Sequence, residues 1–418
     1  MSPEHIPTWT LFPFVGLVLS MALLPMLVPH AWEKRWFQAL VVCAFSTPVV
    51  WFFLSHGGQE HVRHAALDYA AFIATLGALF VTAGGIYANG DLEATPRTNV
   101  TFLLVGSVLA SIVGTTGASM LLIRPLLRTN QQHEHTAHLA PFLILAVANA
   151  GGLLTPLGDP PLLVGFIGGV PFFWTLRLFP VWLLYVTSFA VAFYFVDRRA
   201  YAQESRAALT RDRAEQKSLE LRGFGNVALL LAIVPAAFLP AGLRELAMLG
   251  IALASYFTTQ RELHTLNGFT LAPILEVGLL FAGLFACLAP IELGLAARAH
   301  ELPLQKSWHL FWVSGALSSV LDNAPTYAAL AALGRGLSHG HANLVAGVDP
   351  LLLAAVSAGS VVMGATTYIG NGPNLMVKAI AERSGYALPG FFRYAVFAFT
   401  AMLPAHLVMT VAFVLMER

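Results

Sequence analysis

The segment from residue 149 to residue 166 combines helix-breaking residues with one carboxylate inside an apolar region. It reads NAGGLLTPLGDPPLLVGF, so Gly and Pro residues surround Asp159. A carboxylate at membrane depth costs about 2.5–3.5 kcal/mol on insertion scales, which favours a functional role for it. Asp followed by two prolines is also a good helix start, so Asp159 could be an N-cap. The two roles are compatible, because a capping carboxylate can also bind a proton or a cation.

A second broken segment, TTYIGNGPNLMV at 366–377, and two interrupted apolar runs, 98–127 and 308–333, carry similar polar groups. Unwound backbone at membrane depth is tolerated only where protein or a wet cavity satisfies its polar groups. Half-helix ends and hydroxyl or amide oxygens together suit a small hard cation. We therefore expect two Na⁺ sites, with Asp159 and Asp322 as proton carriers. The predicted ion-binding residues are Asn149, Thr155, Pro156, Gly158, Asp159, Thr115, Thr116, Ser119, Asp322, Asn323, Thr326, Thr366, Thr367, Gly370, Asn371 and Asn374.

The composition places the chain in a membrane. Its 418 residues are 57% hydrophobic and 11% charged, and the mean hydropathy is +0.70. Soluble domains carry about 25% charged residues, so this chain could not cover a water-exposed surface. A net charge of +1 implies no nucleic-acid partner. We find no P-loop, nucleophile constellation or metal-ligand spacing, which argues against an enzyme, an ATP-driven pump and a cofactor.

The distribution of Lys and Arg predicts the membrane topology. A span needs about 20 apolar residues, and positive charges concentrate in cytoplasmic loops. The excess of Lys and Arg on the cytoplasmic side is largest when the runs 98–127 and 308–333 are re-entrant hairpins and the N-terminus is outside. The charged loop 197–224 is then a cytoplasmic linker, which could be helical. A solvated connector is the favoured interpretation, with a regulatory segment as the alternative. We expect a multi-pass protein of the cell (inner) membrane.

The two halves of the chain repeat one pattern. SIVGTTGASMLLI matches SSVLDNAPTYAAL, TPLGDPPLLV matches TYIGNGPNLMV, and ALDYAAFIATLGALF matches ILEVGLLFAGLFACL. With five spans and one hairpin in each half, the second half enters from the opposite side, as in many secondary transporters. The predicted fold is all-α, an inverted repeat of 5+5 spans. The first repeat is 1–196, with hairpin 98–127 and broken helix 138–170, and the second is 225–418, with hairpin 308–333 and broken helix 349–381.

Other titratable residues have less specific patterns. Asp68 and Glu276 are matched in the repeat near span starts, where pathway and interfacial roles are equally compatible. Asp349 precedes Pro350 and is expected to be only a cap. The histidines of QQHEHTAH could sense pH near a pathway mouth, although loop histidines are more often simply solvated.

On these residues the chain resembles the ion transporter superfamily, which includes NhaD-type sodium/proton antiporters, citrate and dicarboxylate carriers, and arsenite pumps. The resemblance covers essentially the whole chain and is most specific at NAGGLLTPLGDPP and TTYIGNGPNLMV. It implies a flanking scaffold, a transport unit that moves like an elevator, and a homodimer. The hairpin tips GTTGAS and LDNAPT depart from the Ser-Asn-Thr signature of sodium-coupled dicarboxylate carriers, whereas Gly-Asp after Thr-Pro matches the antiporter branch.

The leading functional hypothesis is a Na⁺ (or Li⁺)/H⁺ antiporter. The expected core holds Asp159 and Asp322 and no Lys or Arg, because Arg124 and Lys378 fall toward the cytoplasmic ends. The alternative is a carrier of citrate or another organic anion, coupled to Na⁺ or to a metal, because half-helix N-termini could hold carboxylates.

Overall fold

The computed structural model describes residues 6–417, and 76% of the chain is helical. Seven helices are long and apolar enough to cross a membrane: Thr8–Pro25, Arg35–Ser55, Gln59–Gly84, Pro96–Val113, Phe172–Tyr201, Ala272–Ala297 and Phe391–Met416. Large apolar side chains are exposed along these and other helices, as lipid contact requires; Phe392 is 81% exposed. The chain is an all-α polytopic membrane protein, as its composition predicted.

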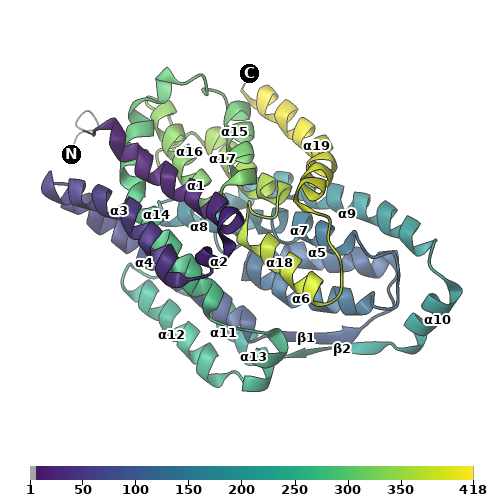
Figure 1. Cartoon of the computed structure of the whole chain (residues 1–418). Coiled ribbons are helices and arrows are strands. Elements are labelled where there is room, and N and C mark those ends of the chain that lie inside the picture. Colours follow the sequence, from purple (N-terminus) through teal and green to yellow (C-terminus); the bar gives the residue numbers. More distant parts are fainter. Residues whose placement is uncertain (1–5, 418) are drawn as a thin grey trace.

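One set of helices, here called the flanking group, lies to one side of the molecule in Figure 1. Its core is aromatic and aliphatic, and Phe72 of α4 stacks on Phe281 of α14 with 4.7 Å between ring centroids. The group comprises α1 (Phe12–Leu27), α3 (Arg35–Ser55), α4 (Gln59–Gly84), α11 (Phe224–Ala236), α12 (Leu243–Thr258) and α14 (Ala272–Ala297), with the short elements η2 (Thr8–Leu11), α2 (Pro29–Trp32) and α13 (Arg261–Asn267).

Most of the remaining helices form the core group, which supplies most of the largest hydrophobic cluster among residues 6–417. The core group comprises α5 (Pro96–Val113), α6 (Thr115–Thr129), α7 (Leu139–Ala146), η3 (Ala150–Leu154), α8 (Pro160–Ile167), η4 (Phe172–Leu178), α9 (Phe179–Tyr201), η5 (Ala299–Glu301), α15 (Ser307–Val320), α16 (Asn323–Leu337), α17 (Pro350–Val362), η6 (Met363–Thr366), α18 (Gly372–Arg383) and α19 (Phe391–Met416).

Helix breaks in the core group fall inside the segments that the sequence singled out. α5 and α6 occupy the first expected hairpin and are separated only by Gly114, whose φ of 82° is unfavourable for other residues. α15 and α16 occupy the second, with the break at Leu321 and Asp322. The α7–η3–α8 and α17–η6–α18 segments each unwind between two half-helices. The order of elements is therefore the same in both halves of the core group.

The segment between the halves is more structured than a solvated connector. α9 continues to Tyr201, and then come α10 (Arg206–Ala214) and the strand β2 (Lys217–Arg222). β2 pairs antiparallel with β1 (Tyr87–Asp91), which follows α4. This ribbon was not predicted, although KSLELR alternates polar and apolar residues as strands do. We call the face of the protein that carries α10 and this ribbon the linker face.

Candidate functional site

Asp159 lies at the centre of the core group, where both helix breaks and both hairpin tips meet. The side chain is only 2% exposed. One carboxylate oxygen, Oδ1, accepts hydrogen bonds from Thr115 Oγ1 at 2.7 Å and from Asn371 Nδ2 at 3.2 Å. The other, Oδ2, accepts one from Asn323 Nδ2 at 2.6 Å. Three separate elements thus supply donors to one buried carboxylate, which requires such partners in a dry environment.

The capping interpretation of Asp159 is wrong. Its backbone is extended and precedes α8, but its side chain makes no capping hydrogen bond. Asp322 does cap α16, accepting from the Ala324 N–H at 3.1 Å. Asp349 caps α17, accepting from the next two free N–H groups at 2.8 and 3.3 Å. Of these three residues, only Asp159 directs its carboxylate to neighbouring elements instead of to the N–H groups of its own helix.

Three predicted asparagines form a buried amide network beside Asp159. Asn149 Nδ2 donates to Asn374 Oδ1 at 2.8 Å, and Asn149 Oδ1 accepts from Asn371 Nδ2 at 3.2 Å. Asn374 Nδ2 donates to the carbonyl oxygens of Gly364 and Thr367, both at 2.9 Å. The network joins the two unwound segments and satisfies backbone groups that a broken helix leaves free.

Thr155 and Thr367 hold the broken helices to the hairpins instead of facing Asp159. Thr155 Oγ1 donates to the carbonyl of Ser111, and Thr367 Oγ1 donates to that of Ser319 at 2.6 Å. The serines of the hairpins add equivalent bonds, such as Ser318 Oγ to the Ser360 carbonyl at 2.6 Å. These serines were not among the predicted site residues, although SIVGTT and SSVLDN have serines at matched positions.

The other predicted residues divide into cavity-lining and structural positions. Thr326 and Thr366 donate to carbonyls of their own helical turns, so they do not contact Asp159. Gly370 and Gly158 allow close backbone crossings, because an added Cβ at Gly370 would lie 2.5 Å from the carbonyl oxygens of Gly364 and Ser318. The residues that line the cavity described next are Thr115, Thr116, Pro156, Gly158, Asp159, Asp322 and Asn371.

Two site residues have buried oxygens without a hydrogen-bond partner. They are Ser119 Oγ and Asn323 Oδ1, and both residues are fully buried. Buried polar atoms normally have a partner, so these two oxygens remain available as acceptors. Asn323 contacts Asp159 through its amide nitrogen, and Ser119 lies one helical turn after Thr115 in α6. Oxygens of these types are the ligands that hard cations take. No cluster of three or more His, Cys, Asp or Glu residues suited to a metal occurs within residues 6–417.

A cavity of about 350 Å³ separates the flanking and core groups beside Asp159. It lies along α6 and α18 and along the parts of α4 and α14 nearest the linker face, where Glu276 also lines it. Glu276 accepts a hydrogen bond from Gln38 Nε2 at 2.9 Å. Within the described residues, the lining includes three carboxylates, Asp159, Glu276 and Asp322, and no Lys, Arg or His.

A smaller cavity, of about 40 Å³, lies between the two groups toward the opposite face, along α8 and α16. Asp68 lines this cavity and also a neighbouring one of about 230 Å³ between α4 and α14. Arg335 of α16 crosses this gap and pairs with Glu292 of α14, with 3.2 Å between Nη1 and Oε1. Asp68 and Glu276 are the carboxylates that the repeat matches. Glu276 lines the cavity of about 350 Å³, and Asp68 lines the cavities of about 40 and 230 Å³ toward the opposite face.

Comparison with known proteins supplies the family. No curated protein gives a significant match to this chain. The family described as "Putative citrate transport" matches residues 3–414, which is nearly the whole chain. This match agrees with the resemblance to citrate-transporter-like membrane proteins. The chain belongs to the family described as putative citrate transport.

Proposed function

We propose that the protein is a secondary transporter that exchanges Na⁺ or Li⁺ for H⁺ at Asp159. The single observation that carries this proposal is the buried Asp159 carboxylate, reached by a cavity whose described lining holds carboxylates and no cationic side chain. An anionic site of this kind attracts cations and disfavours free anions.

Competition at one carboxylate produces exchange. An ionised carboxylate in a dry site is costly, so it binds either a proton or a cation. A bound cation would take oxygens of Asp159, Thr115, Ser119 and Asn323, whereas a proton would leave Asp159 neutral among its present donors. Because the two occupants exclude each other, the release of one on each side of the membrane couples their gradients.

The two cavities support alternating access. We propose that the linker face is cytoplasmic and that the halves of the chain are inverted repeats. In this proposal the cavity of about 350 Å³ faces the cytoplasm, and the cavity of about 40 Å³ lies on the external path between the two groups. A displacement of the core group along the flanking group would exchange their sizes, bringing Asp159 toward Asp68 instead of Glu276.

Family membership favours a second candidate, a carrier that moves citrate together with a cation. The cavity volume of about 350 Å³ falls within the range of small-molecule sites. The N-termini of α8 and α18 both border this cavity and could hold carboxylates. In this candidate Asp159 still binds the coupling cation, which neutralises charge in an otherwise acidic site.

Proteoliposomes containing a pH-sensitive dye distinguish the two candidates. Under an imposed proton gradient, we expect Na⁺ or Li⁺ to change the internal pH and K⁺ to do so much less. No response to any cation, together with uptake of labelled citrate only when Na⁺ or a divalent metal is present, would replace the antiporter by the citrate carrier. No response to either substrate class would refute both.

The Arg335–Glu292 pair is expected to bias the protein toward the observed state. Both side chains are about one-third exposed, so the pair contributes at most about 1 kcal/mol, or roughly fivefold in population. In Glu292→Gln, a cysteine introduced at Val164 beside the small cavity should react up to about fivefold faster with an impermeant maleimide added outside. Glu382→Gln is the matched control, because Lys378 and Glu382 pair within α18 alone. Equal labelling rates in all three proteins would exclude this bias.

A further inference from the structure

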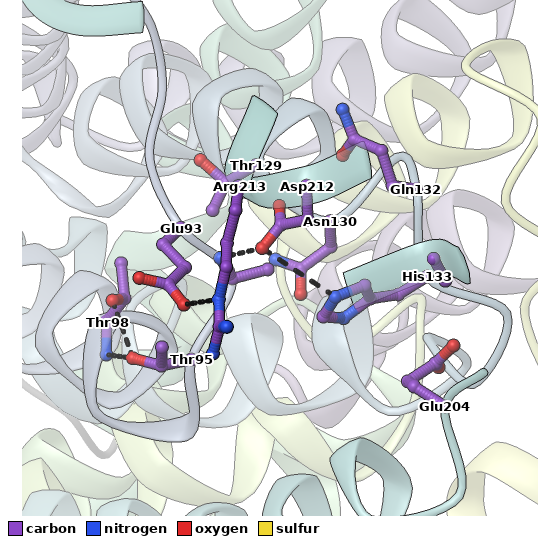
Figure 2. Close-up of polar contacts among 12 residues, drawn as sticks. Glu93, Thr95, Thr98, Thr129, Asn130, Gln132, His133, Glu204, Asp212 and Arg213 are labelled. Atoms are coloured by element: carbon purple, nitrogen blue, oxygen red, sulfur yellow. Dashed lines mark hydrogen bonds and ion pairs between the residues drawn. The ribbon is translucent and has the colours of Figure 1, made fainter. Parts of the chain in front are cut away.

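Three histidines on the linker face each lie against a carboxylate of the segment between the two halves. His133 Nε2 is 3.9 Å from Asp212 Oδ2, and Figure 2 shows this contact as a dashed line. His135 Nδ1 is 3.2 Å from Glu204 Oε1. His138 Nε2 is 2.8 Å from Asp197 Oδ1. We call residues 131–138 the histidine loop; it joins α6 to α7 in the core group.

The contact between His133 and Asp212 is buried and incomplete. The two side chains are 5% and 1% exposed, so His133 is not the solvated loop histidine that its sequence context favoured. His133 Nε2 and Asp212 Oδ1 have no hydrogen-bond partner, while Asp212 Oδ2 accepts from the Ala94 N–H at 3.0 Å. One additional proton on this pair would create a charge-assisted contact for His133 Nε2, which otherwise has no hydrogen-bond partner.

Polar contacts hold α10 in place. Only Ala208 and Asp212 are buried in this nine-residue helix. Gln132 donates to Glu215 Oε2 at 3.0 Å, and Arg213 donates to Glu93 Oε1 at 3.0 Å. Because little apolar area is buried, docking of α10 depends on the charges of the groups around it.

Carboxylates outnumber fixed cations around the histidine loop. The titratable and charged groups that face it or its partners are Asp91 and Lys217 of the ribbon, Glu93 before α5, Arg128 of α6, Asp197 and Tyr201 of α9, Glu204, Asp212 and Arg213 of α10 and its approach, and Glu215. Protonation of the histidines would therefore neutralise a locally acidic cluster.

In the chain, α10 lies between α9 of the core group and α11 of the flanking group. β2 continues from it to the flanking group, where Arg222 pairs with Glu262 of α13 at 2.9 Å and Asn226 Nδ2 donates to the Gly85 carbonyl at 3.0 Å. An extended chain spans about 3.3–3.6 Å per residue. Released from the histidine loop, residues 202–216 could reach much farther than they do as a docked helix.

We propose that the linker is a pH-responsive tether: docking of α10 on the protonated histidine loop restrains movement of the core group, and deprotonation releases it. This rests on the proposed function, because it assumes that the core group moves during transport. It assigns to the histidine loop a regulatory role that is separate from cation binding at Asp159.

The sign of the pH effect follows from proton linkage. Burial raises the pKa of Asp212, with hydrogen bonding from Ala94 and the nearness of His133 acting in the opposite direction. The docked state therefore binds protons more tightly at this residue, so docking is favoured as pH falls and lost as pH rises. The pKa of Glu204 shifts in the opposite direction: burial raises it, but the backbone N–H groups of Glu134 and His135 lower it overall. The contribution of Glu204 to docking is therefore lost only as the pH falls below the ordinary titration range of a glutamate.

Spin-label distances test the tether without requiring transport. In a background with Cys43 and Cys287 replaced by alanine, labels at the exposed positions Thr210 on α10 and Arg261 on α13 report docking. At pH 6 we expect one narrow distance distribution in lipid nanodiscs, and at pH 8.5 a broad one. The docked fraction should fall by up to about tenfold per pH unit for each proton involved. His133→Gln and Asp212→Asn should each remove most of this pH response.

His64→Gln is the control, because His64 and Glu60 form an exposed pair within α4, and it should behave as the unmodified protein does. A distribution that does not change with pH, or a pH response that survives both His133→Gln and Asp212→Asn, would overturn the tether. Transport measured in parallel separates the proposals. In His133→Gln, activity should persist at pH 6; if no substrate is transported but the distances respond to pH, the proposed function fails and the docking switch stands.

Discussion

Asp159→Asn is expected to abolish transport while leaving the protein folded. Asn has nearly the same shape, and Thr115 can rotate its hydroxyl to donate to Asn or to accept from it. The substitution removes the negative charge of Asp159, and the groups that contact it directly, Thr115, Asn323 and Asn371, are all neutral. Loss of one partner from a buried charge pair costs about 3–5 kcal/mol, so cation affinity should fall by more than about a hundredfold.

The measurement is Na⁺-dependent pH change in proteoliposomes, with a thermal melt of the same preparation to check folding. Asp349→Asn is the matched control: Asn caps a helix about as well as Asp does, and Asp349 uses its carboxylate for capping. Asp322→Asn tests the second proposed proton carrier in the same way. Normal transport by Asp159→Asn would exclude Asp159 as the shared proton and cation site under either candidate function.

The sequence identified Asp159 because a carboxylate between Gly and Pro residues at membrane depth is costly and informative. It did not reveal which way the side chain faces, since an N-cap and an inward-facing ligand have the same local sequence. The direction of the Asp159 side chain depends on Thr115, Asn323 and Asn371, which come from three other elements. Such convergence is tertiary information that local patterns do not contain.

The ordered structure of the linker was not predicted for the same reason. High charge and low hydrophobicity predicted a solvated connector, because isolated short helices and strands are marginal in water. β2 is ordered by pairing with β1, more than 120 residues earlier in the chain, and α10 is ordered by His133 and Ala94. Helix breaks, in contrast, were predictable to within a few residues because Gly and Pro act locally.

Gly158→Ala is expected to destabilise the core group and to eliminate transport. An added Cβ would lie 2.2 Å from the carbonyl oxygen of Gly152 and 2.8 Å from its carbonyl carbon. Both neighbours are backbone atoms of the unwound segment, so relief requires backbone displacement, with a cost of about 1–3 kcal/mol or more. The Gly158 carbonyl also accepts from the Thr115 N–H at 2.7 Å. Its displacement would therefore move a residue that donates directly to Asp159.

Gly372→Ala provides the control because it lies at the start of the corresponding half-helix, α18, and an added Cβ there meets no atom within 4 Å. We expect it to retain its melting temperature and its transport, or to gain slightly from the higher helix propensity of Ala. Thermal melts followed by size-exclusion chromatography in detergent measure both proteins, and proteoliposome assays measure exchange. If Gly158→Ala melts normally and transports normally, the unwound segment is flexible enough to admit a side chain. In that case the tight crossing at Asp159 would not define a rigid binding site.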